Sequence, residues 1–512
     1  GGRTAPTTGL SICCAVYGRL PVPRMRTARL VVLVVVAVAL GSLAAPEAST
    51  TETPRVVVVG GGLAGLSATL QLVADAGGEV QVVLLEKESK LGGNSAKASS
   101  GINALTPASG DSVDLYTNDT LVSGGGRSRT ELVSKLVGES EDAVAFLASH
   151  GVQLGKLTQL GGHSAKRTHS NVAGPNVGSF IIRALSEAVK QLPQVNVVTS
   201  AKVKHLLVSG SKGEHRVAGV SYSTPAAGAE SDDPASLPTD NHTLEADAVI
   251  LATGGFGAER DMLRRYNSAV DGFATTNGQW ATGDGMVMGH AIGGQLVDMD
   301  KIQIHPTGFV NPKDPQAGTK FLAPERLRGV GGILLNSFGK RFVNELGRRD
   351  YVTEVMLRQE GKTAWLLLGD VQAADFGEAA LGFYAGKAGI ATKGDSVEGI
   401  AAAIAVEADV LRTELDRYSS AVRSGQADEF GKTVFPNGAI NPQGTMYVMK
   451  VTPVVHYTMG GLSIDQHARV LDTAGKAIPG LLAAGEVTGG VHGANRLGGN
   501  SLLDCTVFGR IA

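Results

Sequence analysis

Alternating apolar and glycine-rich segments predict a nucleotide-binding unit near the start of the chain. Arg55–Val59 is an uninterrupted apolar run typical of a buried strand, and Gly60–Gly65 follows it as a glycine-rich turn. From Leu66 the sequence predicts a helix, and Val80–Leu85 then predicts a second strand that ends at Glu86. This order of strand, glycine turn, helix, strand and terminal acid predicts a βαβ dinucleotide-binding unit.

Each glycine of this turn, and the acid after the second strand, has a physical task. Gly60 forms the tight turn, Gly62 lets the backbone approach a pyrophosphate, and Gly65 permits close packing of the helix on the strand. The N-terminus of the helix faces the phosphate charge. Glu86 accepts hydrogen bonds from an adenosine ribose.

Three further segments point to a flavin rather than a nicotinamide. Leu91–Asn103 is a loop of small residues, which leaves a flat and bulky ring room against the backbone. Ala248–Gly257 is a strand that runs into another glycine turn, and Gly480–Glu486 repeats the theme of strand, glycine and acid. We therefore expect one FAD-binding domain that is interrupted by an insertion.

The intervening sequence predicts a helical lobe and a long loop. Gln372–Gly425 is rich in alanine and predicts helices, especially over Val397–Leu415. Ser221–Asp240, full of Ala, Ser, Pro and Asp, predicts a surface loop. A last helix is predicted to start near Asn500, and the chain stops within it at Ala512, so we expect a truncated C-terminus or a missing continuation.

Composition narrows the class of protein. The chain has 512 residues, 43% hydrophobic and 18% charged, which is enough for more than one domain with a sizeable core. Its 46 Lys and Arg residues nearly balance 48 Asp and Glu residues, so nothing in the charge favours nucleic acid. The 3 cysteines form no metal-ligand, haem or disulfide pattern, so no metal is expected.

The N-terminal sequence predicts targeting to the secretory pathway. Residues 25–45 contain the basic Arg26 and Arg29, the apolar run Leu30–Leu40 and then small residues, which is the pattern of a signal peptide. Residues 1–24 are then a leader or a gene-model artefact. The run is short of the ~20 residues that a spanning helix needs, so no stable membrane span is expected after signal removal. We expect the ER lumen, with a mitochondrial presequence or a short membrane anchor as alternatives.

Six motifs carry a family resemblance. They are Gly92–Asn103, Gln303–Thr307, Gly339–Glu345, Arg349–Asp350, His456–Gly461 and His492–Ser501. With these motifs the chain resembles the flavoproteins of the fumarate reductase/succinate dehydrogenase family, in particular the soluble single-chain fumarate reductases of the flavocytochrome c and yeast-type groups. The resemblance runs from about Arg55 to Ala512. It implies FAD-dependent reduction of fumarate to succinate.

The resemblance also implies an architecture. The fold would be α/β, with a Rossmann-like FAD-binding domain split by an inserted α+β capping domain. Residues 52–299 would form the first part of the FAD-binding domain and residues 457–512 the second part. Residues 300–456 would form the capping domain, which helps to bind the substrate.

Site residues follow from the matching motifs. By resemblance, His305, His456 and Arg496 hold the substrate carboxylates. Guanidinium groups suit carboxylates because they bind them bidentately. Hydride would pass from the flavin N5 to one alkene carbon, and Arg349 would protonate the other. Glu325 and Arg328 match the pair that feeds protons to this arginine. The substrate site would also include Gly101 and Gly499, with Glu325 beside them.

The same resemblance, with the glycine turns, assigns the FAD contacts. They are Gly60, Gly62, Gly65, Glu86, Lys87, Gly93, Asn94, Ser95, Ser100, Gly101, Val203, Thr253, Gly254, Asp284, Tyr457, Glu486, Ser501 and Leu502.

General acid–base chemistry alone would choose another proton donor. Arginine has a pKa above about 12, whereas a catalytic acid works best with a pKa near the operating pH. The residues alone would therefore favour His305 or His456. The family precedent favours Arg349, with the Glu325 carboxylate and a dry site as compensation.

Two positions depart from the family pattern. Members that link FAD covalently carry a histidine where this chain has Asn94, so FAD is expected to bind without a covalent bond. Pro324 stands where flavocytochrome-type members have a threonine whose hydroxyl touches the substrate. One hydrogen bond to the substrate, worth about 1 kcal/mol, is then absent or replaced.

Other functions stay open from the sequence. One is a flavin-dependent reductase or dehydrogenase of another enoate or ketone, such as urocanate or a ketosteroid, although a steroid would leave Arg496 buried and unpaired. Another is an inactive FAD-binding remnant. The electron donor would be a reduced flavin or a redox partner. His163 and His169 are as readily loop polar residues as functional ones.

Overall fold

The structure is a computed structural model that describes residues 53–512, apart from 173–175, 211–214 and 227–237. The predicted leader and signal peptide, residues 1–45, lie outside the described residues. Across the described part of the chain, no helix is both long and apolar enough to span a membrane.

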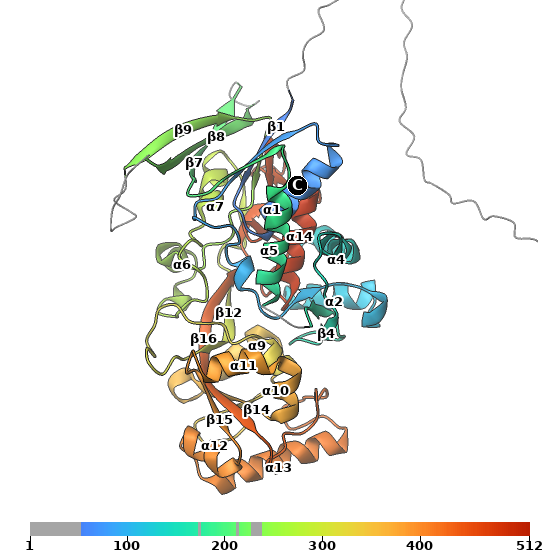
Figure 1. Cartoon of the computed structure of the whole chain (residues 1–512), viewed down its shortest axis with the longest axis vertical. Helices are drawn as coiled ribbons and strands as arrows, with labels where there is room; N and C mark the ends of the chain where they lie inside the picture. The colour runs from blue at the N-terminus through green and yellow to red at the C-terminus, as the bar shows by residue number, and fades with distance from the viewer. Residues whose placement is uncertain (1–52, 173–175, 211–214, 227–237) are drawn as a thin grey trace, which may run out of the picture. The chain divides into compact units, whose positions relative to one another are not determined.

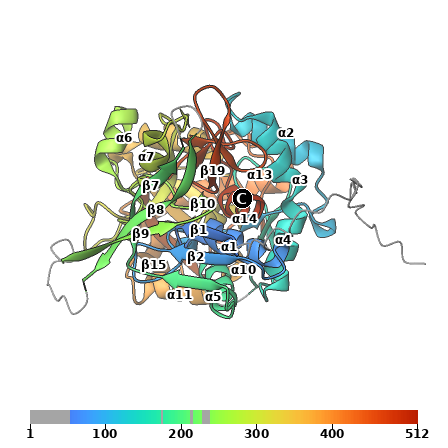
Figure 2. The same ribbon diagram turned by 90° about the horizontal axis from the view of Figure 1, so that it is seen from above.

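A six-stranded sheet forms the centre of one half of the molecule. Figure 2 looks onto this half from above. Its order is β18 (Arg469–Leu471), β19 (Ala477–Ala483), β10 (Ala248–Leu251), β1 (Arg55–Val59), β2 (Gln81–Leu85) and β6 (Val195–Val198). All neighbours are parallel except β18 and β19. The strands read as apolar runs because helices and loops cover both faces of a parallel sheet. The predicted strands at Arg55, Val80, Ala248 and Gly480 are confirmed as β1, β2, β10 and β19.

Three helices that are far apart in the sequence pack beside this sheet (Figure 1). They are α1 (Leu63–Asp75), α5 (Val177–Lys190) and α14 (Asn500–Ile511). The helix predicted near Asn500 is confirmed, whereas α1 begins at Leu63, three residues before the predicted Leu66. The helix starts early because Gly62 is an extended N-cap. A Cβ atom at Gly509 would lie 2.6 Å from the Ala64 oxygen, so glycine lets α14 approach α1 closely.

Smaller elements surround the main sheet. They are α2 (Val113–Ser123), α3 (Thr130–Gly138), α4 (Ser140–Ser149), α6 (Arg260–Tyr266), α7 (Asp284–Ala291), β3 (Ile102–Asn103), β4 (Lys156–Thr158), β5 (Thr168–Ser170), β7 (Lys202–Ser209), β8 (Arg216–Pro225), β9 (Thr239–Glu245), β11 (Leu296–Val297), β17 (Gly461–Ser463) and β20 (Thr488–Gly489). The loop predicted over Ser221–Asp240 is wrong at its ends, because Ser221–Pro225 belongs to β8 and Thr239–Asp240 to β9. These two strands pair with each other in antiparallel register.

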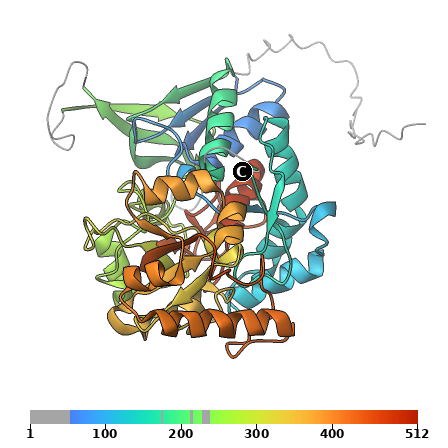
Figure 3. The same ribbon diagram turned by 60° about the horizontal axis from the view of Figure 1, so that its bottom comes forward.

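A second sheet occupies the other half, at the bottom of Figure 1 and in front in Figure 3. It contains β12 (Ile302–Phe309), β16 (Met446–Thr458), β14 (Ala364–Leu368) and β13 (Ile333–Leu335), with β15 (Ala391–Gly394) paired to β16. Its helices are α8 (Arg326–Gly329), α9 (Arg349–Leu357), α10 (Asp370–Phe376), α11 (Glu378–Ala385), α12 (Val397–Ile404) and α13 (Ala408–Ser424).

The predicted helical lobe is present, and Val397–Leu415 is helical as parts of two helices, α12 and α13. Ala405 takes a left-handed conformation with φ 58°, and the chain breaks there between α12 and α13. Residues 53–512 cluster as one unit, and β16 runs without a break through His456, where the predicted domain boundary lies. The division at 299, 300, 456 and 457 therefore stays a prediction. The fold itself is mixed α/β with a parallel central sheet, as predicted.

Candidate active site

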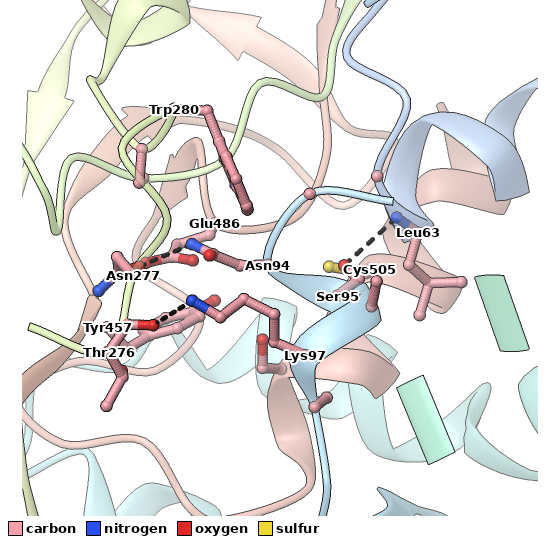
Figure 4. A pocket seen from close by; sticks show the side chains of 18 of the residues that line it. Leu63, Asn94, Ser95, Lys97, Thr276, Asn277, Trp280, Tyr457, Glu486 and Cys505 are labelled. Carbon is pink, nitrogen blue, oxygen red and sulfur yellow. Dashed lines mark hydrogen bonds between the residues drawn. The ribbon is translucent and has the colours of Figure 1, made fainter. Parts of the chain in front are cut away.

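A cavity of about 860 Å³ opens between the two halves. Its wall comes from segments that are far apart in the sequence: the turns after β1 and β10, the loop 93–101, the N-terminal residue of α9, and the start of α14. Figure 4 shows Trp280, Asn277 and Glu486 on one side of the pocket and Leu63, Ser95 and Cys505 on the other.

Seventeen of the predicted FAD contacts line this cavity. They are Gly60, Gly62, Glu86, Lys87, Gly93, Asn94, Ser95, Ser100, Gly101, Val203, Thr253, Gly254, Asp284, Tyr457, Glu486, Ser501 and Leu502. The predicted substrate residues His456, Arg496, Gly499 and Arg349 line it as well. Gly65, His305, Glu325 and Arg328 are not among the residues that line the cavity, and the last three are buried.

The glycine turn after β1 shows why each glycine is needed. Gly60 has φ +107°, and a Cβ atom there would lie 2.4 Å from the Ala252 oxygen. A Cβ at Gly65 would lie only 1.9 Å from the Gly60 oxygen, so this residue serves close packing rather than contact with a ligand. At Gly62 the nearest atom is Ser95 Oγ at 3.8 Å, which leaves the N-terminus of α1 open to the cavity. Such an open helix N-terminus suits a phosphate group.

Two acidic side chains, Glu86 and Asp284, line one end of the cavity. Glu86 accepts hydrogen bonds from the Gly61 and Glu88 backbone N–H groups at 2.7 and 2.8 Å. Burial raises the pKa of Glu86 above its ordinary value, although these hydrogen bonds act in the opposite direction. Lys87 forms an ion pair with Asp284 at 2.7 Å. This end therefore offers a carboxylate acceptor beside a fixed ion pair.

Both polar atoms of the Asn94 side-chain amide form hydrogen bonds with the protein. Its Nδ2 donates to Asn277 Oδ1 at 2.7 Å, and its Oδ1 accepts from the Gly278 N–H at 3.0 Å, as Figure 4 shows for the first of these bonds. The Trp280 ring packs against Gly278, where a Cβ atom would lie 2.2 Å from the ring. An amide in this position has no nucleophilic nitrogen with which to form a bond to a flavin.

Unpartnered polar atoms indicate that the cavity is built for a polar ligand. Ser99 Oγ, Thr253 Oγ1, Trp280 Nε1 and Arg496 Nε are buried in its wall without a hydrogen-bond partner among the described residues. Leaving such groups unsatisfied costs about 1–3 kcal/mol each. The large cavity, the open helix N-terminus and these orphaned donors and acceptors together fit FAD.

Arg349 is the first residue of α9 and is buried against a carboxylate. Its Nε lies 2.7 Å and its Nη2 2.6 Å from Glu325 Oε2, and its Nη1 donates to Gln303 Oε1 at 2.7 Å. The neighbouring Asp350 pairs instead with Arg348 at 3.0 Å, in an exposed position. Arg349 is therefore part of a buried site, whereas Asp350 belongs to a surface ion pair.

Glu325 joins two arginines. It is fully buried, accepts the Gly161 N–H at 3.0 Å on Oε1, and lies 3.7 Å from Arg328 Nη2 through the same oxygen. Burial alone would raise the pKa of Glu325, but the charges of Arg349 and Arg328 outweigh it and lower the pKa. Glu325 is thus held as a carboxylate. We refer to Glu325, Arg328, Arg349 and Arg496 as the arginine cluster.

Two predicted substrate histidines meet through strand pairing. Tyr457 of β16 pairs with Gln303 of β12 and Val455 pairs with Ile304, so His456 is the extra residue of a β-bulge, which redirects its side chain. The rings of His305 and His456 lie 5.1 Å apart, edge to face.

Both histidines keep a nitrogen for a ligand. Thr276 Oγ1 lies 2.7 Å from Nδ1 of His456, and Thr307 occupies Nδ1 of His305. Nε2 of His305 is buried without a partner among the described residues. Burial first, and the charge of Arg349 second, hold the pKa of each histidine well below its ordinary value. Each ring is therefore neutral and serves as a hydrogen-bonding group.

Arg496 is the most unusual cation of the site. Its guanidinium stacks 4.2 Å from the centre of the Tyr457 ring, and its Nη1 donates to the Leu497 oxygen. It forms no ion pair with any described residue. Burial, reinforced by Arg349, lowers the pKa of Arg496 to about 10, so it stays charged at neutral pH.

Sequence reasoning missed the linking role of Gln303. Its amide nitrogen donates to the Arg496 backbone oxygen at 2.7 Å while its amide oxygen accepts from Arg349, so one side chain connects both arginines. Gln303 is the first residue of the Gln303–Thr307 motif, and this position was the signal for it. Lys97, which lines the cavity and donates to the Thr276 oxygen at 2.6 Å, was likewise overlooked (Figure 4). Nothing in the sequence pointed to Asn277 or Trp280.

The two histidines left open by the sequence are buried polar residues. His163 contacts the Gly498 oxygen at 3.0 Å and Arg167 at 3.1 Å. Burial lowers the pKa of His163 to about 4. His169 lies 3.4 Å from Thr106 Oγ1.

Comparison with known proteins gives this site a family. Residues 55–502 match the model of the FAD binding domain. The chain belongs to this FAD-binding family. It is 40% identical over 480 residues to a fumarate reductase of Schizosaccharomyces pombe, covering 91% of this chain and 89% of the relative. It is 39% identical to fumarate reductase 1 of Saccharomyces cerevisiae, covering 89% of this chain and 97% of that protein.

A solved structure agrees with this family. The open conformation of a flavocytochrome c3 fumarate reductase matches with a TM-score of 0.67 and 34% identity, over 90% of this chain and 78% of that one. As a member of the family, the chain takes FAD as its cofactor. The cavity described above is the place in the described structure that fits it.

Proposed function

We propose that this protein reduces fumarate to succinate with FAD bound non-covalently in the cavity. The supporting observation is the uneven charge of the arginine cluster. Arg328 and Arg349 share the single carboxylate of Glu325, and Arg496 forms no ion pair with a described residue. A buried and unpaired cation is costly, so such a site favours a ligand that brings its own negative charges. A small dicarboxylate does this.

The chain's residues have defined tasks in this reaction. Nε2 of His305, the free nitrogen of His456 and the guanidinium of Arg496 bind the substrate carboxylates. Gln303 orients both Arg349 and Arg496. Reduced FAD, when bound, supplies the hydride for one alkene carbon.

Arg349 holds the proton for the other alkene carbon. Its guanidinium is fixed on Glu325 Oε2, with Arg328 on the other carboxylate oxygen. Because its pKa is lowered, Glu325 accepts a proton only transiently, while the proton passes from Arg328 towards Arg349. This assignment rests on the family precedent together with the buried ion pair.

We further propose that a reduced flavin, or else a redox partner, delivers the electrons. The sequence contains neither a haem motif nor a second intact dinucleotide fingerprint. Phe321 and Phe383 line the cavity while 64% and 45% exposed, which offers an aromatic surface that a small dianion does not need. Turnover with reduced FMN as the sole donor tests this proposal.

We also propose that the protein acts in the ER lumen, with the mitochondrion as the alternative. The support is the signal-peptide pattern of residues 25–45. Fractionation of cells that express the chain with and without this segment tests the location.

The deciding experiment measures turnover and flavin content together. FAD-loaded protein is mixed anaerobically with reduced viologen and fumarate, and dye oxidation and succinate are followed. We expect turnover in the unsubstituted protein and its near-complete loss in Arg349→Ala, with flavin still bound. Bound flavin without turnover on fumarate would reject the substrate and direct attention to urocanate, other enoates and ketones. Failure to bind flavin would support an inactive remnant.

A further inference from the structure

A second buried group of charges lies next to the arginine cluster. Glu345 is bound by Arg341 Nε at 2.8 Å and by Lys432 Nζ at 2.9 Å, and Arg341 also contacts Asp428 at 2.9 Å. All four side chains are at most 3% exposed. We call Arg341, Glu345, Asp428 and Lys432 the clasp. It joins two parts of the chain that are more than 80 residues apart.

Aromatic rings enclose both cations of the clasp. Arg341 lies 4.7 Å from the centre of the Tyr418 ring in α13, and Lys432 lies 5.1 Å from the same ring. Phe430 and Phe435 contact the two cations from other sides. Tyr418 also accepts a hydrogen bond from Lys432 at 3.3 Å. The rings fix the positions of the charges, because they keep water out and attract cations.

The clasp holds a segment that leads directly to the catalytic arginine. Glu345 Oε1 accepts the Leu334 N–H at 3.2 Å, which ties the segment to β13. Four residues further along, Arg349 begins α9.

The segment also holds Arg328 from the other side. The backbone oxygen of Glu345 accepts a hydrogen bond from Arg328 Nη1. The Nε and Nη2 atoms of Arg328 have no hydrogen-bond partner in the described structure, and Glu325 is 3.7 Å away. The Glu345 oxygen is therefore the main restraint on the guanidinium of Arg328.

We infer that the clasp positions the proton-delivery residues, and that Lys432 is a positioning residue for Arg328 and Arg349. Lys432 and Arg341 fix Glu345, and through its backbone Glu345 sets both the guanidinium of Arg328 and the start of α9. This inference rests on the proposed function and adds residues to it. Apolar residues would stabilise such a core as well as buried ions do, whereas ion pairs fix the register of one segment against another.

The test compares Lys432→Met with the unsubstituted, FAD-loaded protein. We expect kcat for fumarate to fall about 10- to 100-fold, because a displacement of roughly 1 Å in a catalytic group has an effect of this size. KM for fumarate, the flavin spectrum and the rate of flavin reduction by viologen should stay unchanged. The solvent isotope effect on kcat should rise as proton delivery becomes limiting. Lys432→Arg should restore kcat.

A matched control separates positioning from stability. Ile400→Ala removes a fully buried side chain of α12 in the same half of the molecule, outside the clasp. It should lower the unfolding temperature without lowering kcat. If Lys432→Met behaves like Ile400→Ala, with lower stability and normal kcat, the inference is wrong.

Two further measurements keep the inference testable. If Lys432→Met does not fold, Asp428→Asn weakens the clasp more mildly and should show the same fall in kcat with constant KM; an unchanged kcat in folded Asp428→Asn would reject the inference. In a Glu325→Gln background, Lys432→Met should have little additional effect on the residual rate, because both residues act through Arg349. No turnover in the unsubstituted protein would count against the proposed function, whereas normal turnover in Lys432→Met counts against the clasp alone.

Discussion

The arginine cluster and the clasp are neighbouring buried groups of charges that differ in their charge balance. In the clasp, two cations meet two carboxylates at 2.8–2.9 Å. In the arginine cluster, Glu325 pairs with Arg328 and Arg349, whereas Arg496 forms no ion pair with a described residue. Nε of Arg328 and of Arg496 have no hydrogen-bond partner among the described residues. Both groups are buried: the side chains of the clasp are at most 3% exposed, and those of Glu325, Arg328 and Arg349 at most 5%. They differ in whether the protein itself completes the charges.

This difference separates a structural role from a binding role. Breaking a balanced pair leaves an uncompensated charge in the low-dielectric interior, so a balanced group stabilises a fixed arrangement. A group with excess cations pays a cost in the free protein and regains it when an anion binds. An excess of buried cations therefore favours a place for an anionic ligand, and balanced ion pairs favour the support around it.

The largest expected effect is that of removing the centre of the clasp. Glu345→Ala leaves Lys432 without a carboxylate, and we expect the free energy of unfolding to fall by about 3–5 kcal/mol. Chemical denaturation measures this change. An unfolding free energy equal within error to that of the unsubstituted protein would mean that the clasp is not a balanced structural group.

The same type of change in the arginine cluster should have the opposite sign for stability. Arg496→Met removes a buried cation that lacks an ion pair, so we expect unfolding free energy to stay the same or to rise. Fumarate binding should weaken by about 2–5 kcal/mol, because a buried charge partner of the substrate is lost. Chemical denaturation and fumarate titration of the same variant test these two expectations. Destabilisation as large as that of Glu345→Ala would remove the distinction between the two groups.

Acid should weaken the clasp over a defined pH range. Burial alone would raise the pKa of Glu345, but Lys432 and Arg341 lower it from 4.5 to about 2. Its contribution to stability is therefore complete above pH 4.5 and is lost as the pH falls towards about 2. The loss is at most about 3 kcal/mol. Unfolding free energy measured against pH should show this decrease, and Glu345→Gln should flatten it.

The smallest expected effect concerns the residue before Glu325. Pro324→Thr introduces the hydroxyl that flavocytochrome-type members carry there. If that hydroxyl reaches the substrate, KM for fumarate should fall about fivefold, which corresponds to about 1 kcal/mol. Steady-state kinetics measure it, with flavin content as the control. An unchanged KM would mean that another group already fills this part of the arginine cluster's ligand site.

The FAD-binding segment was predicted well because its determinants are local. The strand Arg55–Val59, the turn Gly60–Gly65 and the acid Glu86 follow one another in the sequence, and each has a fixed geometric task. Errors appeared where local pattern was weak. The polar stretch from Ser221 conceals a strand, and the alanine-rich stretch from Val397 contains a break at Ala405 that composition does not reveal.

The candidate site was predicted residue by residue but not contact by contact. The family motifs supplied His305, Arg349, His456 and Arg496. They did not indicate that Asp350 pairs with Arg348, which frees Arg349 for Glu325. Such a choice depends on which way the first turn of α9 faces, and this orientation is set by packing against β12.

The sequence by itself determined the cofactor, the parallel sheet and the identities of the charged residues, because glycine conformation, strand hydrophobicity and side-chain chemistry are properties of short segments. Only the tertiary structure decided where the charges balance. The bulge that turns His456 towards His305 arises from the register of β12 on β16, and Lys432 reaches Glu345 across more than 80 residues. Electrostatic energy depends on distances between such remote groups and on their burial, and neither quantity exists until the chain has folded.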